Sequence, residues 1–319
     1  MGVKYMKLKV IFLKKKYIYY TVIAIVIIIL FTILLFTKKS TTTFSAVTNN
    51  KSIKADLTGD GVEDILYINK NNDKYYVQVN TKNTSLYLKP DIKLNTVGVY
   101  SSSWPMKVTL MDVNRDNIPE IFIQAQEKGI PVQHIFIWND NNFKDIFSSS
   151  NNILGFMDSK NNKTPKIISE NILNNQISQS NYVLINKSLH DFKFNSKDTF
   201  LGNDSILSFI KYVQGFPSSE PYKPSNIFYP GLTGNDLLTL GKLSGSNIAY
   251  TFQDGLFMDT KWNIDGEVSE VKWILNFKTV SNIDTSIVKT CKISLSLKTS
   301  PNDKGVNNYK IYAILTEMN

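Results

Sequence analysis

Cysteine and histidine are almost absent from this chain of 319 residues, which contains only Cys291, His134 and His190. A single cysteine cannot form an intramolecular disulfide, and so few sulfur and nitrogen donors argue against a zinc site. Cys291 lies in an alternating segment and is predicted to be a small, half-buried strand residue. Both histidines are predicted to be partly exposed strand residues, not metal ligands or catalytic bases.

Acidic residues are missing from the first 39 positions, which hold eight lysines. Of the 36 basic residues, 28 therefore remain to balance all 27 acidic residues in the rest of the chain. The formal net charge of +9 thus belongs mainly to the N-terminus. Because the remainder is nearly neutral, the sequence gives no support for nucleic-acid binding through a basic patch.

Charge is also missing from residues 17–37, a run of 21 residues rich in Ile, Val, Leu and Phe. At about 1.5 Å per residue a helix of this length covers the ~30 Å hydrocarbon core, so the run predicts a transmembrane helix in the lipid bilayer. Six lysines precede it and two follow it closely. Positive charge favours the cytoplasmic side, which predicts a cytoplasmic tail over residues 1–16 and an extracellular C-terminal part.

Three other interpretations of this segment agree less well with the sequence. A cleavable signal peptide usually has a shorter apolar region followed by a small-x-small site, and the stretch from Phe44 to Val47 is a poor one. A lipoprotein needs a cysteine just after the apolar run, where none occurs. A buried core helix is disfavoured because the run is apolar on every face. We therefore expect an uncleaved anchor in the cell membrane.

An internal repeat follows a polar segment, residues 38–52, that is predicted to be a stalk. Each copy has a polar loop that leads into a short apolar strand: residues 56–64, 112–120 and, more weakly, 158–166. The first two loops are rich in acidic residues. The successive copies are offset by 56 and 46 residues. That spacing leaves room for about four short strands per unit, which is the size of one propeller blade.

The first two loops place oxygen donors at alternate positions, with Gly61 and Asn117 at the bends. Hard oxygen donors on a tightly turned backbone suit Ca²⁺, although Asp, Asn and Gly also make ordinary turns without a metal. An EF-hand is excluded because its twelfth position is Tyr67 or Ile123 instead of Glu. The candidate metal ligands are Asp56, Thr58, Asp60, Val62 (carbonyl) and Asp64, then Asp112, Asn114, Asp116, Ile118 (carbonyl) and Glu120.

These loops resemble the calcium-binding repeats of the FG-GAP and VCBS type, which occur in β-propeller ectodomains. The resemblance covers residues 53–199 and implies one propeller-like blade per repeat, with a structural Ca²⁺ in the loop between strands. The third copy has Lys160 and Lys166 where ligands belong, so no metal is predicted there. Three repeats are fewer than the four to eight blades of a closed propeller. An open arc, an array capped by the C-terminal domain, and a blade set completed by other segments therefore all remain open.

Residues 200–319 are predicted to form an α+β domain with an antiparallel sheet. A helix is expected to begin at Asn203 and to end by Gly215. Alternating segments at residues 270–280, 289–298 and 309–316 predict strands, the last two joined by a turn around Pro301. The expected fold is thus an N-terminal transmembrane helix, a mainly β ectodomain of propeller-blade-like repeats, and this C-terminal domain.

Two functions fit these features. The first is a non-enzymatic surface module that senses or binds an extracellular protein or glycan. The second is a cell-wall-directed hydrolase in which Asp254, Asp265, Glu267 or Glu270 act as acid and base. A groove lined by aromatic side chains would favour the hydrolase, whereas their packing into a core would favour the binding module. The aromatic residues concerned are Tyr250, Phe252, Phe257, Trp262 and Trp273. No catalytic residue is predicted.

Overall fold

The computed structural model describes thirteen stretches of the chain. They are residues 15–36, 43–46, 52–91, 93–158, 164–173, 176–193, 202–217, 224, 226–230, 232, 234–245, 247–300 and 309–318. The central part of the third loop and the expected turn around Pro301 lie outside them. The chain divides into two compact units, residues 1–42 and residues 43–319.

The first unit contains the helix α1 (Lys15–Phe36), which includes most of the charge-free run. Within the residues that the structure describes, no helix is both long enough and apolar enough to cross a membrane.

The second unit begins its repeats with a four-stranded antiparallel sheet whose strands are adjacent in chain order. These strands are β2 (Ser52–Ala55), β3 (Asp64–Asn71), β4 (Lys74–Asn80) and β5 (Ser85–Tyr87). The first acidic loop connects β2 to β3. Asn72 and Asp73 have positive φ at the tight turn between β3 and β4, as short hairpin turns require.

The second repeat has the same layout. Its strands are β6 (Lys107–Met111), β7 (Glu120–Glu127), β8 (Ile130–Asn139) and β9 (Asn142–Ser149), again antiparallel and in chain order. The second acidic loop connects β6 to β7, so it occupies the same place as the first. A further strand, β1 (Thr43–Ala46), pairs with β6. Part of the segment that was expected to be a stalk is therefore a strand of this sheet.

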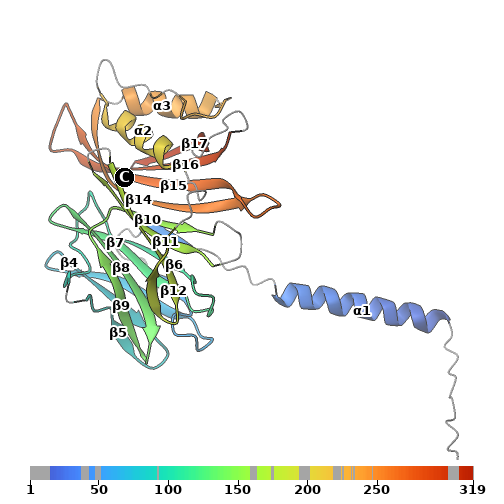
Figure 1. Cartoon of the computed structure of the whole chain (residues 1–319). Coiled ribbons are helices and arrows are strands. Elements are labelled where there is room, and N and C mark those ends of the chain that lie inside the picture. The colour runs from blue at the N-terminus through green and yellow to red at the C-terminus, as the bar shows by residue number, and fades with distance from the viewer. Residues whose placement is uncertain are drawn as a thin grey trace, which may run out of the picture. The chain divides into compact units, whose positions relative to one another are not determined.

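The third repeat supplies β10 (Ile153–Met157), β11 (Lys166–Leu173), β12 (Gln176–Ile185) and β13 (Ser188–Asp191). Its first strand, β10, also pairs in parallel with β14 (Ile248–Trp262). The sheet then continues through β15 (Val268–Ser281), β16 (Val288–Thr299) and β17 (Tyr309–Met318), all antiparallel to their neighbours. This eight-stranded sheet therefore combines four strands of the third repeat with four strands of the C-terminal region that was expected to be a separate domain (Figure 1).

These sheets confirm a mainly β fold with antiparallel pairing, including the strands expected after residue 268. The described strands form three open sheets and no closed barrel. Two helices, α2 (Asn203–Gln214) and α3 (Gly234–Gly245), pack near β14 and β17 (Figure 1). Helix α2 begins and ends where the sequence predicts, whereas α3 was not expected.

Neighbouring sheets share apolar cores, which explains why the central strands are buried on both faces. On β7, Ile121 and Ile123 pack into a core with Leu66 of the first repeat. Phe122, on the opposite face of the same strand, packs edge-to-face on Phe156 of the third repeat, with ring centroids 4.7 Å apart. This alternation stacks the three repeats as consecutive layers.

Helix α2 meets the sheet at a buried carboxyl group. Nδ2 of Asn203 donates a hydrogen bond to Oε1 of Glu170 on β11, at 3.1 Å. The second carboxyl oxygen of Glu170 and Oδ1 of Asn203 are buried without a hydrogen-bond partner among the described residues. Burial raises the pKa of Glu170 to about 7.

Glu170→Gln is predicted to flatten the pH dependence of stability. The raised pKa means that the folded state holds a proton that the unfolded state loses above about pH 4.3, so this contribution is complete below that pH and declines as pH rises through 7. Chemical denaturation between pH 4 and 8 should show this slope in the parent chain. In the variant the slope should be smaller, with a free energy of unfolding roughly 1–3 kcal/mol higher at pH 8. Glu267→Gln, at an exposed turn, is the control, and an unchanged slope in Glu170→Gln would contradict the prediction.

Candidate functional site

The first acidic loop folds around its own carboxylates. Oδ1 and Oδ2 of Asp56 accept hydrogen bonds from the backbone N–H groups of Gly59 and Gly61, at 2.7 and 2.8 Å. Oδ1 of Asp60 accepts one from the N–H of Val62, at 2.8 Å. Gly59 and Gly61 have φ of 77° and 80°, a backbone region that residues with a Cβ atom rarely adopt.

The second loop repeats this geometry bond for bond, 56 residues later. Asp112 accepts from the N–H groups of Arg115 and Asn117, at 2.7 and 3.0 Å, and Asp116 accepts from the N–H of Ile118, at 2.8 Å. Arg115 and Asn117 have φ of 69° and 67°, although neither is glycine. The same backbone conformation is therefore imposed on a less permissive sequence, which indicates that the hydrogen-bonded carboxylate determines it.

The last residue of each loop ties the loop to a strand. Oδ2 of Asp64 accepts from the N–H of Leu57 at 2.8 Å, and Oε2 of Glu120 accepts from the N–H of Val113 at 2.9 Å. Both carboxyl groups are buried. In the first loop, Oδ1 of Asp64 and Oγ1 of Thr58 are also buried and make no hydrogen bond of standard geometry among the described residues, although the Thr58 hydroxyl lies close enough to Asp64 to lower the pKa of that carboxyl group. These are two of the five positions predicted to bind a metal.

Both buried carboxyl groups are held in an unfavourable electrostatic environment. Burial is the largest cause that raises the pKa of Asp64, and repulsion from Asp60 and Asp56 adds to it. For Glu120 the same causes, burial first, raise the pKa to about 8. The acidic side chains within each loop therefore lie close enough to repel one another.

The donor chemistry suits Ca²⁺ better in the first loop than in the second. Thr58 and Asp64 each retain an unused buried oxygen, whereas Oδ1 of Asn114 already accepts the N–H of Asp116, at 2.9 Å. With the other carboxylates turned toward backbone N–H groups, the described part of the chain contains no group of three or more His, Cys, Asp or Glu side chains that could hold a metal ion.

The two loops lie against each other. A Cβ atom added to Gly59 would be 2.5 Å from Cδ1 of Ile118 in the second loop. Gly59 therefore serves both the left-handed backbone conformation and the close approach of the two loops.

The third loop is described only at its ends. The N–H of Asp158 donates to Oδ2 of Asp259 on β14, at 2.5 Å, and Nε1 of Trp262 donates to the carbonyl of Asp158, at 2.7 Å. Burial, with repulsion from Asp158 added, raises the pKa of Asp259 to about 7. The first residue of the third loop is thus bonded to a C-terminal strand, whereas the first residues of the other two loops form hydrogen bonds within their own loops.

His134 is buried, so the prediction of a partly exposed residue was wrong for it. Its Nδ1 lies 2.7 Å from Oδ2 of Asp145, and its Nε2 donates to the carbonyl of Thr96, also at 2.7 Å. His190 is exposed, on β13. Cys291 is fully buried instead of half-buried, and burial raises the pKa of its thiol to about 12, which suits a core residue.

The aromatic groove considered for the C-terminal region is not formed. Trp273 is fully buried and stacks on Phe257 with ring centroids 4.3 Å apart, and Tyr250 belongs to the same core. Trp262 is partly buried against that core. Phe252 lines a cavity together with polar side chains from several strands. A packed core in this region is the outcome that favours the binding module over the hydrolase.

Asp254, one of the acid–base candidates, holds two sheets together. Its Oδ2 accepts hydrogen bonds from Nζ of Lys107 and from Nε1 of Trp104, both at 2.5 Å. Its Oδ1 accepts one from Nδ2 of Asn276, at 2.7 Å. The Lys107 and Asp254 side chains are almost completely buried, so this is an internal ion pair between β6 and β14.

Of the other three candidates, Asp265 and Glu267 are exposed and Glu270 is partly buried. Asp265 and Glu267 lie in the turn between β14 and β15, where Oδ1 of Asp265 accepts the N–H of Glu267, at 3.1 Å. Glu270 accepts from Nζ of Lys261 and from the hydroxyl of Tyr312, both at 2.9 Å. The carboxylates of Asp265 and Glu270 are thus engaged in a local turn and in cross-strand contacts, and Glu267 lies in the same turn as Asp265.

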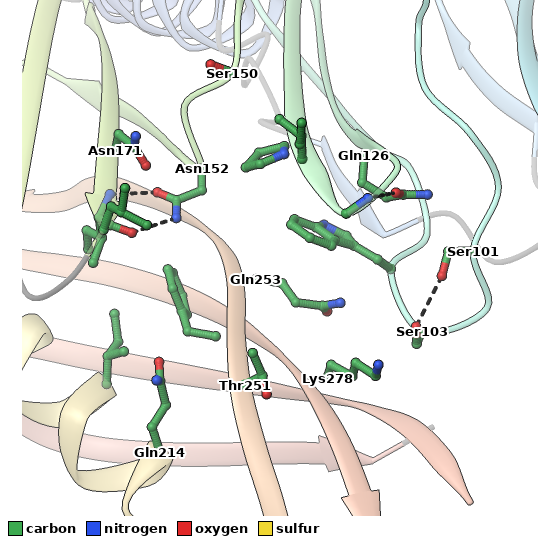
Figure 2. A pocket seen from close by; sticks show the side chains of 18 residues that line it. Ser101, Ser103, Gln126, Ser150, Asn152, Asn171, Gln214, Thr251, Gln253 and Lys278 are labelled. Carbon is green, nitrogen blue, oxygen red and sulfur yellow. Dashed lines mark hydrogen bonds between the residues drawn. The ribbon is translucent and has the colours of Figure 1, made fainter. Parts of the chain in front are cut away.

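A cavity of about 960 Å³ opens where the second repeat, the third repeat and α2 meet (Figure 2). We call it the polar cavity. Side chains on its wall include Trp104, Gln126, Asn152, Gln214, Gln253 and Lys278. They come from distant parts of the sequence, and the sequence patterns did not predict this cavity.

Gly59→Ala is predicted to destabilise the protein more than Gly61→Ala. Both residues have positive φ, so each alanine costs about 1–2 kcal/mol of backbone strain. Only at Gly59 does the new Cβ also meet Ile118, which adds about 1–3 kcal/mol, while nothing lies within 4 Å at Gly61. Urea unfolding of the two variants measures the difference, and equal losses would show that the loops are not in contact.

The FG-GAP-like repeat family model matches residues 56–123, from the first acidic loop to β7. No curated protein matches the chain. The match covers less than half of the chain and confirms the FG-GAP resemblance for the segment that carries both well-formed loops. An FG-GAP-like repeat in a set of antiparallel sheets indicates a β-repeat module of the binding type.

Proposed function

We propose that this chain is a single-pass membrane protein that displays a calcium-stabilised β-repeat binding module outside the cell. The observation that carries the proposal is the loop geometry found twice, with equivalent hydrogen bonds from equivalent positions. Its expected partners are an extracellular protein or glycan.

Calcium binding is supported by the donors that the first loop leaves unused. Burying a hydroxyl and a carboxylate oxygen without partners costs about 1–3 kcal/mol each, and this cost needs a compensating ligand. Oγ1 of Thr58 and Oδ1 of Asp64 are in this situation. A divalent cation also offsets the repulsion among the loop carboxylates, most strongly in the folded state. We place Ca²⁺ at the first loop, with a weaker site at the second.

The anchor is supported by the sequence of α1 and its flanks. The helix carries residues 17–36 of the charge-free run, with Tyr17, Tyr19 and Tyr20 at its start, where aromatic rings favour the headgroup layer. Six lysines precede the run and only two lie just beyond it. This asymmetry supports a topology with the N-terminus in the cytoplasm and residues 43–319 outside the cell.

A role in binding, without catalysis, is supported by the C-terminal region. Of the carboxylates considered for acid–base chemistry, Asp254 is held in an internal ion pair, Asp265 in a turn and Glu270 in a cross-strand contact. The aromatic residues that could have formed a substrate groove fill a core instead. The polar cavity remains as the concave surface of the described structure that suits a ligand.

Millimolar Ca²⁺ is predicted to raise the thermal midpoint of the full chain, purified in mild detergent and first treated with chelator. Extracellular sites of this kind have Kd values of about 10⁻⁴–10⁻³ M, so 10 mM Ca²⁺ should add about 1–3 kcal/mol and a midpoint shift of several degrees. Thr58→Val removes an oxygen that would coordinate Ca²⁺ but preserves the shape of the side chain, and it should abolish most of the calcium-induced shift in thermal midpoint. The variant should be at least as stable as the parent in chelator, because it also removes an unpaired hydroxyl.

Asp265→Asn is the control, since it changes an exposed turn carboxylate outside the loops. It should leave the calcium shift unchanged. A parent chain whose midpoint does not respond to Ca²⁺ would overturn the calcium assignment.

Ile27→Lys combined with Ile28→Lys is predicted to release the chain from the membrane fraction of cells. Two lysines at the middle of a spanning helix cost about 2.5–3.5 kcal/mol each. External protease should digest residues 43–319 of the parent chain in intact cells but spare a tag at the N-terminus. Ile283→Lys, at a position that is 84 % exposed, serves as the control. A parent chain found outside the membrane fraction, or protected from external protease, would refute the proposed anchor and orientation.

A further inference from the structure

We infer that the polar cavity is a binding site for an uncharged oligosaccharide. This inference rests on the proposed binding role and names the ligand class that the cavity fits. Its volume of about 960 Å³ lies at the upper end of ordinary ligand pockets, which is sufficient for a short chain of sugar rings.

The charge of the cavity wall excludes strongly ionic ligands. Lys278 is the single charged side chain among the described residues that line it, and no Arg, Asp or Glu contributes. A phosphate or carboxylate group is normally held by Arg or by several cations, and a cationic ligand needs carboxylates. The wall instead offers amide and hydroxyl groups, which suit a neutral ligand with many hydroxyls.

Some of the amides in the wall are already used to hold its shape. The Asn152 side chain donates to the carbonyl and accepts from the N–H of Ile172, at 3.0 and 2.8 Å. The Gln126 side chain donates to the carbonyl of Val99 and accepts from the N–H of Gly129, both at 2.8 Å. These bonds fix the β7–β8 turn and the end of β11, so the cavity is preorganised (Figure 2).

Other polar groups in the wall have no partner in the described structure. Gln253 is only 6 % exposed, yet no hydrogen bond engages its amide, and Figure 2 shows it in the middle of the cavity. Gln214, Thr251 and Lys278 line the same space without described hydrogen bonds. An amide presents a donor and an acceptor side by side, which matches two neighbouring hydroxyl groups of a sugar ring.

Two aromatic side chains complete the wall. Nε1 of Trp104 is already bonded to buried Asp254, so the indole offers the cavity an apolar ring and no free donor. Phe252 is partly buried in the same wall. Apolar faces beside amides suit a sugar ring, which is apolar on its C–H face and polar at its rim.

The test is isothermal titration of the full chain in detergent with three neutral tetrasaccharides: maltotetraose, cellotetraose and tetra-N-acetylchitotetraose. At least one is expected to bind saturably. Gln253→Ala should weaken that binding by about tenfold or more, because it removes a buried partner of the ligand. Gln214→Ala, at an exposed helix end, should weaken it several-fold, and it provides a second variant should Gln253→Ala fold poorly.

Lys278→Ala and Lys272→Ala form a matched pair, since both lysines lie on β15 but only Lys278 lines the cavity. Lys278→Ala should weaken binding, whereas Lys272→Ala should leave it unchanged. Binding that none of the cavity variants alters would overturn the location. Absence of saturable binding to all three sugars, or tighter binding of tetragalacturonate or of an uncharged Ser-Asn-Gly peptide, would overturn the ligand class.

These outcomes are separable from failure of the proposed function. A calcium shift and membrane location without sugar binding would reject only the saccharide inference. Sugar binding that depends on Gln253 but persists without a calcium shift would reject only the calcium part of the proposal.

Discussion

The hydrogen bond from the second residue of each acidic loop to the carboxylate that ends the loop is the contact on which the repeat unit depends. Asp64 and Glu120 are the first residues of β3 and β7, and each accepts the N–H of a buried residue, Leu57 or Val113. The bond fixes where the second strand of the repeat starts. It also turns an apolar side chain inward, into the core shared with a neighbouring sheet.

The stacking of the three repeats as consecutive layers follows from these fixed strand starts. Because every side chain of a strand alternates between two faces, a central strand such as β7 must present apolar residues to both neighbours. Phe122 and Ile123 satisfy this requirement on adjacent positions. The array does not close into a ring. The third repeat instead continues through the parallel pair β10–β14 into the C-terminal strands, so its edge is covered by the rest of the chain.

Local chemistry explains how much of this could be predicted from the sequence. The loops, the hairpins after them and α2 depend on residues close in sequence, and their patterns were sufficient. The pairing of Ile153 with Gly255 joins segments about a hundred residues apart, and neither segment carries a pattern that specifies its partner. The burial of His134 depends likewise on Thr96 and Asp145 from other segments. The polar cavity arises from the same long-range contacts, which is why no motif predicted it.

The acidic loops and the polar cavity stand at opposite ends of the same two strands. Glu120 opens β7 beside the second loop, and Gln126 lies near its other end, in the cavity wall. Six residues of extended chain separate them by about 20 Å, so a cation in the loop cannot touch a ligand in the cavity. On β6, Met111 adjoins the loop, while Lys107 makes the buried ion pair with Asp254 behind Trp104. In the proposed function, a cation would therefore act on the cavity only by stabilising the strands that build its wall, so that proposal gives the loops a structural role and the cavity the role of recognition.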